Sequence, residues 1–144
     1  MLRISKLADY AMLIMSFMAK TPNAAVLSAN ALAEELHLTP PTASKVLKML
    51  AEANLVASVR GSEGGYHLAR PAANISVADV VMAIEGKVSM TECCAMEGLC
   101  NIEALCTMKE NWLKINSMIY SMLSKFSIID MAKPLSSTRL AYDK

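Results

Sequence analysis

The stretch TPPTASKVLKMLAEANLVASVRGSEGGYHLARP, residues 39–71, decides the fold of this chain. Its first part predicts a helix that starts after Thr39 and ends near Asn54. Pro40 and Pro41 suit the first turn of this helix, because the N–H groups that proline lacks have no helical partner there. The apolar residues at helical spacing predict its buried face: Ala43, Val46, Leu47 and Leu50.

Two short runs after this helix predict a β-hairpin. Residues 56–60 and 66–70 are short strand-like runs, and the loop between them, residues 61–65, contains three of the chain's five glycines. Glycine permits the positive φ angles that a tight hairpin turn requires. Pro71 then closes the unit.

Two helices are predicted ahead of this stretch. The first spans the apolar run before Thr21, and the second is a short helix over residues 28–36. The charge of Asp9 argues against a signal peptide in the first run. The apolar face of the first helix is expected to contain Ile4, Leu7, Ala8, Ala11, Met12, Met15 and Met18. The elements between Ser5 and Arg70 have the order of a winged helix-turn-helix: helix, helix, turn, helix and hairpin.

The second half predicts a helix, a loop and a longer helix. Ser76 and Asp79 resemble a capping box for a helix that stops at Gly86. From Leu105 to Ile129 apolar residues recur in alternating steps of three and four, for about 25 residues, as in a coiled-coil seam. Such a helix packs either onto its own domain or, as we expect, onto a second copy of the chain.

The expected fold is therefore mostly α with a small β-hairpin wing, and it divides into four parts. Residues 1–86 form the winged helix-turn-helix domain with the helix that follows it, and 87–106 form a cysteine loop. Residues 107–131 form a dimerisation helix, and 132–144 a flexible tail.

Composition narrows the function without deciding it. The chain is 54% hydrophobic, too apolar for a disordered protein, and its net charge of +1 neither supports nor excludes DNA. No apolar run reaches the roughly 18 residues of a transmembrane helix, so a cytoplasmic protein without membrane contact is expected. No arrangement of nucleophile, paired carboxylates or phosphate-binding loop suggests an enzyme.

The outer side of the predicted third helix is a candidate DNA-reading surface. If the apolar stripe is buried, polar residues face outward, where they can contact bases and phosphates in the major groove. Cations at the two ends of the hairpin extend this surface along the flanking phosphates. The predicted DNA-binding residues are Thr42, Ser44, Lys45, Lys48, Arg60 and Arg70. A dimer would present two such helices one helical turn apart, to the double-stranded DNA of a palindromic operator.

All four cysteines of the chain lie in one short window, at positions 93, 94, 100 and 106. Steps of six residues turn a helix by about 240°, so only a loop can gather these sulfurs around one centre. Zinc sites use closer cysteine pairs, whereas an iron–sulfur cluster tolerates wider spacing. Cys94, Cys100 and Cys106 are therefore candidate cluster ligands and Cys93 a spare thiol; a group of free cysteines is the alternative.

Three sequence features, taken together, are specific enough to indicate a protein family. Residues 1–11, residues 55–68 with the glycine-rich hairpin, and the three spaced cysteines resemble the IscR/NsrR family of bacterial winged-helix regulators. The likeness extends over residues 1–131, and within the family it is nearest to the branch that regulates the SUF cluster-assembly operon. It implies a homodimer with crossing helices, in which an iron–sulfur cluster of the 2Fe–2S or 4Fe–4S type alters operator affinity.

The resemblance also suggests where a fourth ligand comes from. IscR-like proteins carry a histidine three residues after the last cysteine, but this chain has Lys109 there, a poor ligand while protonated. NsrR-like proteins use an aspartate of the first helix that reaches across the dimer, and Asp9 matches that position. The expected function is a repressor of cluster-assembly genes; a cluster-free thiol switch and a cluster carrier are the alternatives.

Overall fold

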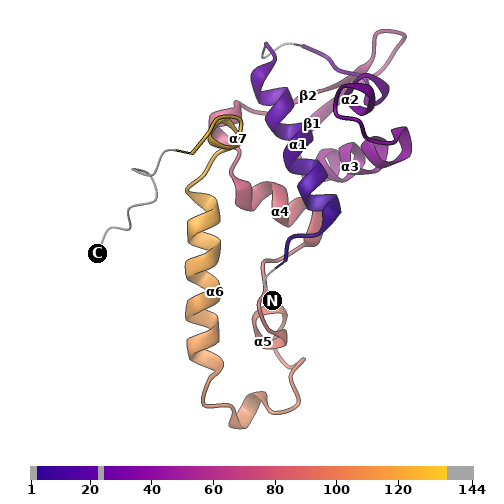
Figure 1. Ribbon diagram of the computed structural model, residues 1–144. Helices are drawn as coiled ribbons and strands as arrows, with labels where there is room; N and C mark the ends of the chain where they lie inside the picture. Colours follow the sequence, from indigo (N-terminus) through magenta and orange to yellow (C-terminus); the bar gives the residue numbers. More distant parts are fainter. Residues whose placement is uncertain (1–2, 23–24, 136–144) are drawn as a thin grey trace.

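A computed structural model describes residues 3–22 and 25–135 of the chain (Figure 1). In these residues the chain is mostly helical, with one two-stranded antiparallel sheet, as the sequence predicts. Most of the predicted tail, residues 136–144, lies outside the described part. No helix within that part is long and apolar enough to cross a membrane.

Helix α1 (Lys6–Lys20) is the central element of the core. The hydroxyl of Ser5 caps it by accepting a hydrogen bond from the Ala8 N–H. Its inward face is nearly the predicted one, with these residues buried: Ala8, Ala11, Met12, Ile14, Met15 and Met18. Ile4 departs from the prediction, because it precedes the helix and is 50% exposed.

Helices α2 (Ala29–Glu35) and α3 (Pro40–Glu52) form the helix-turn-helix. His37 adopts a positive φ of 54° in the turn between them. Both prolines occupy the first turn of α3, and the predicted stripe of α3 is buried against the core. Thr39 precedes α3 without making a side-chain cap, because its hydroxyl pairs with that of Thr42 at 2.7 Å.

The hairpin consists of β1 (Val56–Val59) and β2 (Gly65–Leu68), slightly shorter strands than predicted. Near the hairpin loop, β2 is joined to the segment before α2, because the N–H groups of Leu27 and Tyr66 each donate to the other's carbonyl oxygen. Gly65 permits this approach: a Cβ there would lie 2.5 Å from the Leu27 carbonyl oxygen. The wing is therefore fixed to the body through the start of β2, close to the hairpin loop.

Helix α4 (Val77–Glu85) follows a short 3₁₀ turn, η1 (Ala72–Asn74), and has the predicted capping box. Ser76 Oγ accepts from the Asp79 N–H, and the Asp79 carboxylate accepts from the Ser76 N–H. The helix ends at Gly86, whose φ is +81°. After it come α5 (Glu92–Ala95) and the 3₁₀ turn η2 (Glu103–Leu105), inside the window that the sequence predicts to be loop.

The predicted C-terminal helix is divided in two. Helix α6 (Lys109–Ser124) ends, and α7 (Ile128–Met131) starts after Ser127, which forms a second capping box with Asp130. The Val77 N–H donates to the Phe126 carbonyl and the Ile128 N–H to the Ile75 carbonyl, at 2.8 and 2.9 Å. The prediction of one continuous helix is wrong because this elbow docks on the start of α4, and Ile128 is fully buried.

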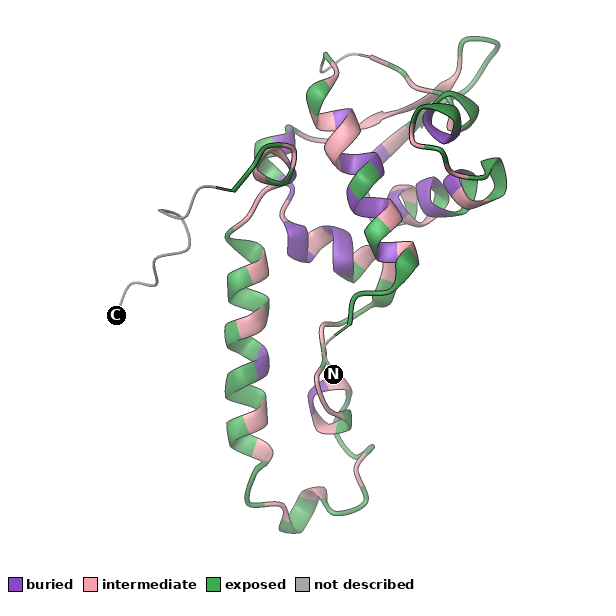
Figure 2. Ribbon diagram, viewed as in Figure 1, coloured by how far each residue is buried: buried purple, intermediate pink, exposed green. Residues whose placement is uncertain are grey.

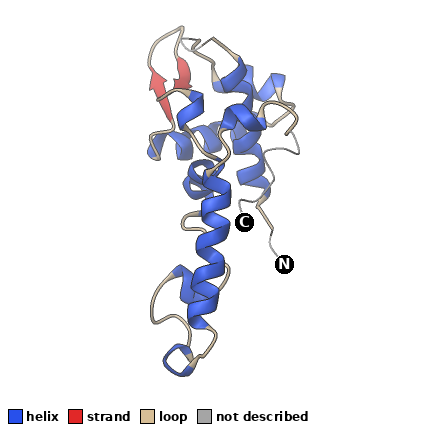
Figure 3. Cartoon of the chain, turned by 90° about the vertical axis from the view of Figure 1, so that its left-hand side faces the viewer, coloured by secondary structure: helices blue, strands red, loops and turns tan. Residues whose placement is uncertain are grey.

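Helix α6 extends away from the helical body, with most of its surface exposed (Figure 2). The hairpin and the α5–η2 segment lie at opposite ends of the molecule (Figure 3). The candidate DNA-reading surface and the cysteines thus occupy different regions, connected through α4 and α6.

Candidate nucleic-acid interface and cysteine segment

The outer face of α3 carries the predicted DNA-binding side chains. Ser44, Lys45 and Lys48 are exposed, as predicted, whereas Thr42 is half-buried beside Thr39. Within residues 3–22 and 25–135, neither lysine ammonium group has an ion-pair partner. Both cations are therefore available to an anionic partner such as a phosphate backbone.

Arg60 extends this surface onto the wing. It follows β1 directly and is exposed, as are Gly61 and Ser62 beside it in the loop. Helix α3 packs against β1, the strand that Arg60 follows, so the helix and the wing are neighbours in the fold. A recognition helix with a basic residue on an adjacent wing can contact a groove and the neighbouring backbone together.

Arg70 has an internal role that the sequence did not predict. Its Nη2 lies 3.2 Å from Asp79 Oδ2 in an ion pair, and its Nε donates to the Asn74 carbonyl oxygen at 3.0 Å. Asp79 accepts this bond with the same oxygen that caps α4. Arg70 thus ties the exit of the wing to α4, and its contact with DNA stays a prediction.

Two of the cysteines share one hydroxyl group. Cys93 and Cys94 lie on α5, and Cys94 is 1% exposed. The Thr91 hydroxyl donates to Cys94 Sγ at 3.2 Å and lies 3.1 Å from Cys93 Sγ. Cys100 and Cys106 are half-buried on the turns that follow, and all four thiols are free.

The arrangement of the single chain does not assemble the predicted metal site. Three thiolates in one segment have the donor chemistry of an iron–sulfur ligand set. However, the described residues contain no group of three His, Cys, Asp or Glu side chains placed to hold a metal ion. The chain as it stands does not fit a preformed cluster site, and ligation by Cys94, Cys100 and Cys106 stays a prediction.

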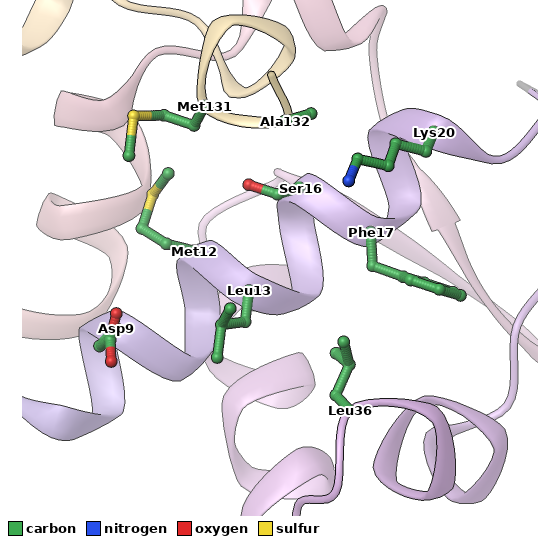
Figure 4. Close-up of a pocket in the computed structure, with 9 residues that line it drawn as sticks. All are labelled: Asp9, Met12, Leu13, Ser16, Phe17, Lys20, Leu36, Met131 and Ala132. Atoms are coloured by element: carbon green, nitrogen blue, oxygen red, sulfur yellow. The ribbon is translucent and has the colours of Figure 1, made fainter. Parts of the chain in front are cut away.

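Asp9 is exposed on α1, where it lines a pocket of about 290 Å³ rather than a site with the cysteines. In Figure 4, Asp9 and Lys20 lie at opposite ends of this pocket, and Met12 and Met131 face each other between α1 and α7. An Asp9 ligand would therefore have to serve the cysteines of a second subunit.

Lys109 is held in an ion pair that sequence reasoning missed. Its Nζ lies 2.6 Å from Glu103 Oε1, and Glu103 Oε2 accepts from the Gly98 N–H at 2.7 Å. These hydrogen bonds lower the pKa of Glu103, and the bond to Glu103 raises the pKa of Lys109. The raised pKa favours the protonated form of Lys109, which cannot bind a metal ion. The ion pair with Glu103 instead closes the loop that contains Cys106, and the Gly98–Glu103 bond closes the loop that contains Cys100.

Comparison with known proteins agrees with this architecture. Residues 4–134 match the model of the Rrf2 family, described as an iron-dependent transcriptional regulator. The chain is 30% identical over 131 residues to a Mycobacterium tuberculosis protein named as an HTH-type transcriptional regulator, covering 91% of this chain and 81% of that one.

Two solved structures extend the comparison to the whole fold. CymR, the global cysteine regulator of Bacillus subtilis, superimposes with a TM-score of 0.72 at 26% identity, covering 92% of this chain and 97% of that one. IscR of T. potens gives 0.69 at 27% identity, covering 98% and 93%. With its winged helix, exposed basic α3 and match over residues 4–134, this chain belongs to the Rrf2 family of transcriptional regulators.

Proposed function

We propose that this chain is a cytoplasmic, homodimeric repressor that binds a palindromic operator of iron–sulfur cluster assembly genes, as in the SUF-regulating branch it resembles. The observation that carries DNA recognition is that Lys45 and Lys48 on α3 are exposed and have no ion-pair partner among the described residues, with a third exposed cation, Arg60, directly after β1. In this proposal Ser44 and Thr42 contact bases, and the three cations contact phosphates or guanine edges.

Dimerisation through α6 is supported by its exposed apolar side chains. Leu113, Ile115, Met118 and Met122 are 40%, 42%, 66% and 39% exposed in the single chain. Apolar side chains repeated along one helix are stabilised by burial against another copy. Such a dimer would place two α3 helices on one side of a duplex and would require an operator with two-fold symmetry.

We further propose that the cysteine segment is the sensor and that its ligand is an iron–sulfur cluster. The support is the confinement of Cys94, Cys100 and Cys106 to one segment and the likeness to IscR. Asp9 of the second subunit is the proposed fourth ligand. The bound group would supply a redox-sensitive, labile centre, and the chain's own part is to present thiolates on a segment attached to α6.

A cluster-free thiol switch is the second candidate. It is favoured by two observations: the described residues bring no three potential metal ligands together, and the fold is similar to that of CymR, a global cysteine regulator. In this alternative Cys93 or Cys94 pairs with Cys100 or Cys106 upon oxidation. A cluster carrier remains a weaker alternative, because it leaves the exposed cations of α3 without a role.

The two candidates separate in one experiment. The protein is purified without oxygen, its iron and visible absorbance are measured, and its affinity for a selected operator duplex is compared before and after iron removal, at one salt concentration. Iron binding that Cys100→Ala abolishes, together with a change in operator affinity, is expected. An iron-free, colourless protein that gains an internal disulfide upon oxidation would establish the thiol switch instead.

A further inference from the structure

A buried asparagine on the dimer helix holds the segment that leads to the cysteines. Asn116 is the one buried residue of α6, with 9% of its surface exposed. Its Nδ2 donates to the Val88 carbonyl oxygen at 2.9 Å, and its Oδ1 accepts from the Met90 N–H at 3.0 Å. One side chain thus satisfies two backbone groups that lie 26 and 28 residues away in sequence.

This geometry requires an amide. A carboxamide presents a donor and an acceptor together, as the edge of a neighbouring β-strand does. Both bonds are partly buried, and aspartate, leucine or alanine at position 116 would leave at least one of the two backbone groups without its protein partner. Asn116 therefore fixes residues 88–90 on α6 in a single register.

The held segment lies between two functional parts of the chain. Gly86 ends α4 two residues before Val88, and Thr91 follows Met90 directly. The Thr91 hydroxyl contacts the sulfurs of Cys93 and Cys94. A chemical change at these sulfurs, by ligation, oxidation or alkylation, alters the Thr91 contacts one residue from the Asn116 bond.

We propose that Asn116 is a positioning residue that couples the chemical state of Cys93 and Cys94 to helix α6, and thereby to operator affinity. This inference rests on the proposed function, because it requires the cysteines to control DNA binding. It does not depend on whether the sensor holds a cluster or a disulfide, because both act on the same thiols beside Thr91.

A double-mutant cycle on the full-length protein tests this coupling. Operator dissociation constants are measured for the wild type, Cys94→Ala, Asn116→Ala and the double variant, on a duplex selected from a random pool with the wild type. We expect Cys94→Ala to change the dissociation constant by about fivefold or more in the wild-type background, and by much less when Asn116 is absent. Ser117→Ala, at an exposed position of the same helix on the side away from Ile115, is the matched control and should leave the Cys94→Ala effect intact.

A merely structural role for Asn116 gives a different result. In that case Asn116→Ala weakens binding in both cysteine backgrounds by the same factor, and this additivity overturns the proposal. If neither Cys94→Ala nor Cys93→Ala has an effect even in the wild-type background, the cysteine sensor itself is wrong and the coupling falls with it. The two failures are distinguishable because only the second leaves the wild-type background unresponsive.

Hydrogen exchange keeps the proposal testable if Asn116→Ala folds poorly. Asn116→Asp retains an acceptor for the Met90 N–H but loses the donor to the Val88 carbonyl. We expect faster exchange at residues 88–94 in Asn116→Asp, with α3 amides unchanged, and a weakened response to Cys94→Ala. Unchanged exchange at residues 88–94 would overturn the holding role of this side chain.

Discussion

Replacing one lysine on the outer face of α3 should change the salt dependence of DNA binding by a calculable amount. Lys45 and Lys48 are exposed and have no ion-pair partner in the described residues, so each can release a counterion by contacting a phosphate. Each phosphate contact contributes about 0.9 to the slope of log affinity against log salt. In a dimer Lys48→Ala removes two contacts and should flatten the slope by about 1.8.

The same reasoning sets the loss of affinity. Relative to 1 M salt, two contacts with a combined slope of about 1.8 account for about 60-fold in affinity at 0.1 M salt. Lys48→Ala should therefore weaken operator binding by up to about 60-fold at 0.1 M, with a smaller loss as the salt concentration rises. Fluorescence anisotropy titrations of a labelled duplex at several salt concentrations measure both quantities.

Lys133→Ala serves as the control for this experiment. Lys133 is an exposed lysine after α7, and Figure 1 places α7 and α3 on different sides of α1. Its loss changes the net charge equally without touching the proposed surface. The assignment of α3 as the reading helix is refuted if Lys48→Ala leaves the slope unchanged, or if Lys133→Ala flattens it by the same amount.

Three further predictions concern assembly, stability and pH. Ile115→Glu puts a charge on the exposed apolar side of α6 and should yield monomers in sedimentation velocity, whereas Lys114→Glu should remain dimeric; a dimeric Ile115→Glu would exclude this seam. Ile128→Ala, at a fully buried site, should lower the free energy of unfolding by about 2–5 kcal/mol in urea titrations, and a loss below 1 kcal/mol, on the order of a surface change, would contradict the docked elbow. The pKa of Glu103 is lowered from 4.5, so the stabilising effect of its contacts is present above that value and declines as the pH falls through the folded pKa. Protection of the Gly98 amide from hydrogen exchange should fall accordingly in acid, and Glu103→Gln should remove most of this dependence.

The secondary structure of the winged helix-turn-helix is predicted well from the sequence, because local signals determine it. The two prolines after Thr39, the helical stripe of α3 and Gly61, whose φ is +117°, each specify a backbone conformation without a distant partner. The outward placement of Lys45 and Lys48 follows from that stripe and is confirmed. Arg70 could not be placed in this way, because its ion pair with Asp79 depends on how the hairpin packs against α4.

The break between α6 and α7 was missed for a different reason. The steps of three and four continue through Phe126 and Ile129, so periodicity alone gives no signal at the elbow. The signal was present in Ser127 and Asp130, which have the same spacing as the capping box at Ser76 and Asp79. The path of the cysteine segment could not be predicted, because wide spacings leave a loop free until a ligand or a second subunit fixes it.

The bridge between Ser76 and Ser127 limits how the sensor can act on DNA. It joins the start of α4 to the elbow of α6, and Asp79, in the capping box of α4, also binds Arg70 at the exit of the wing. The wing, α4, α7 and the near end of α6 are thereby tied into one body. The far end of α6 lies beside α5 and is outside these contacts. We therefore expect a change at the cysteines to alter how α6 packs against α6 of a second copy, and so to change the spacing of the two α3 helices. We do not expect it to bend the winged helix-turn-helix domain itself.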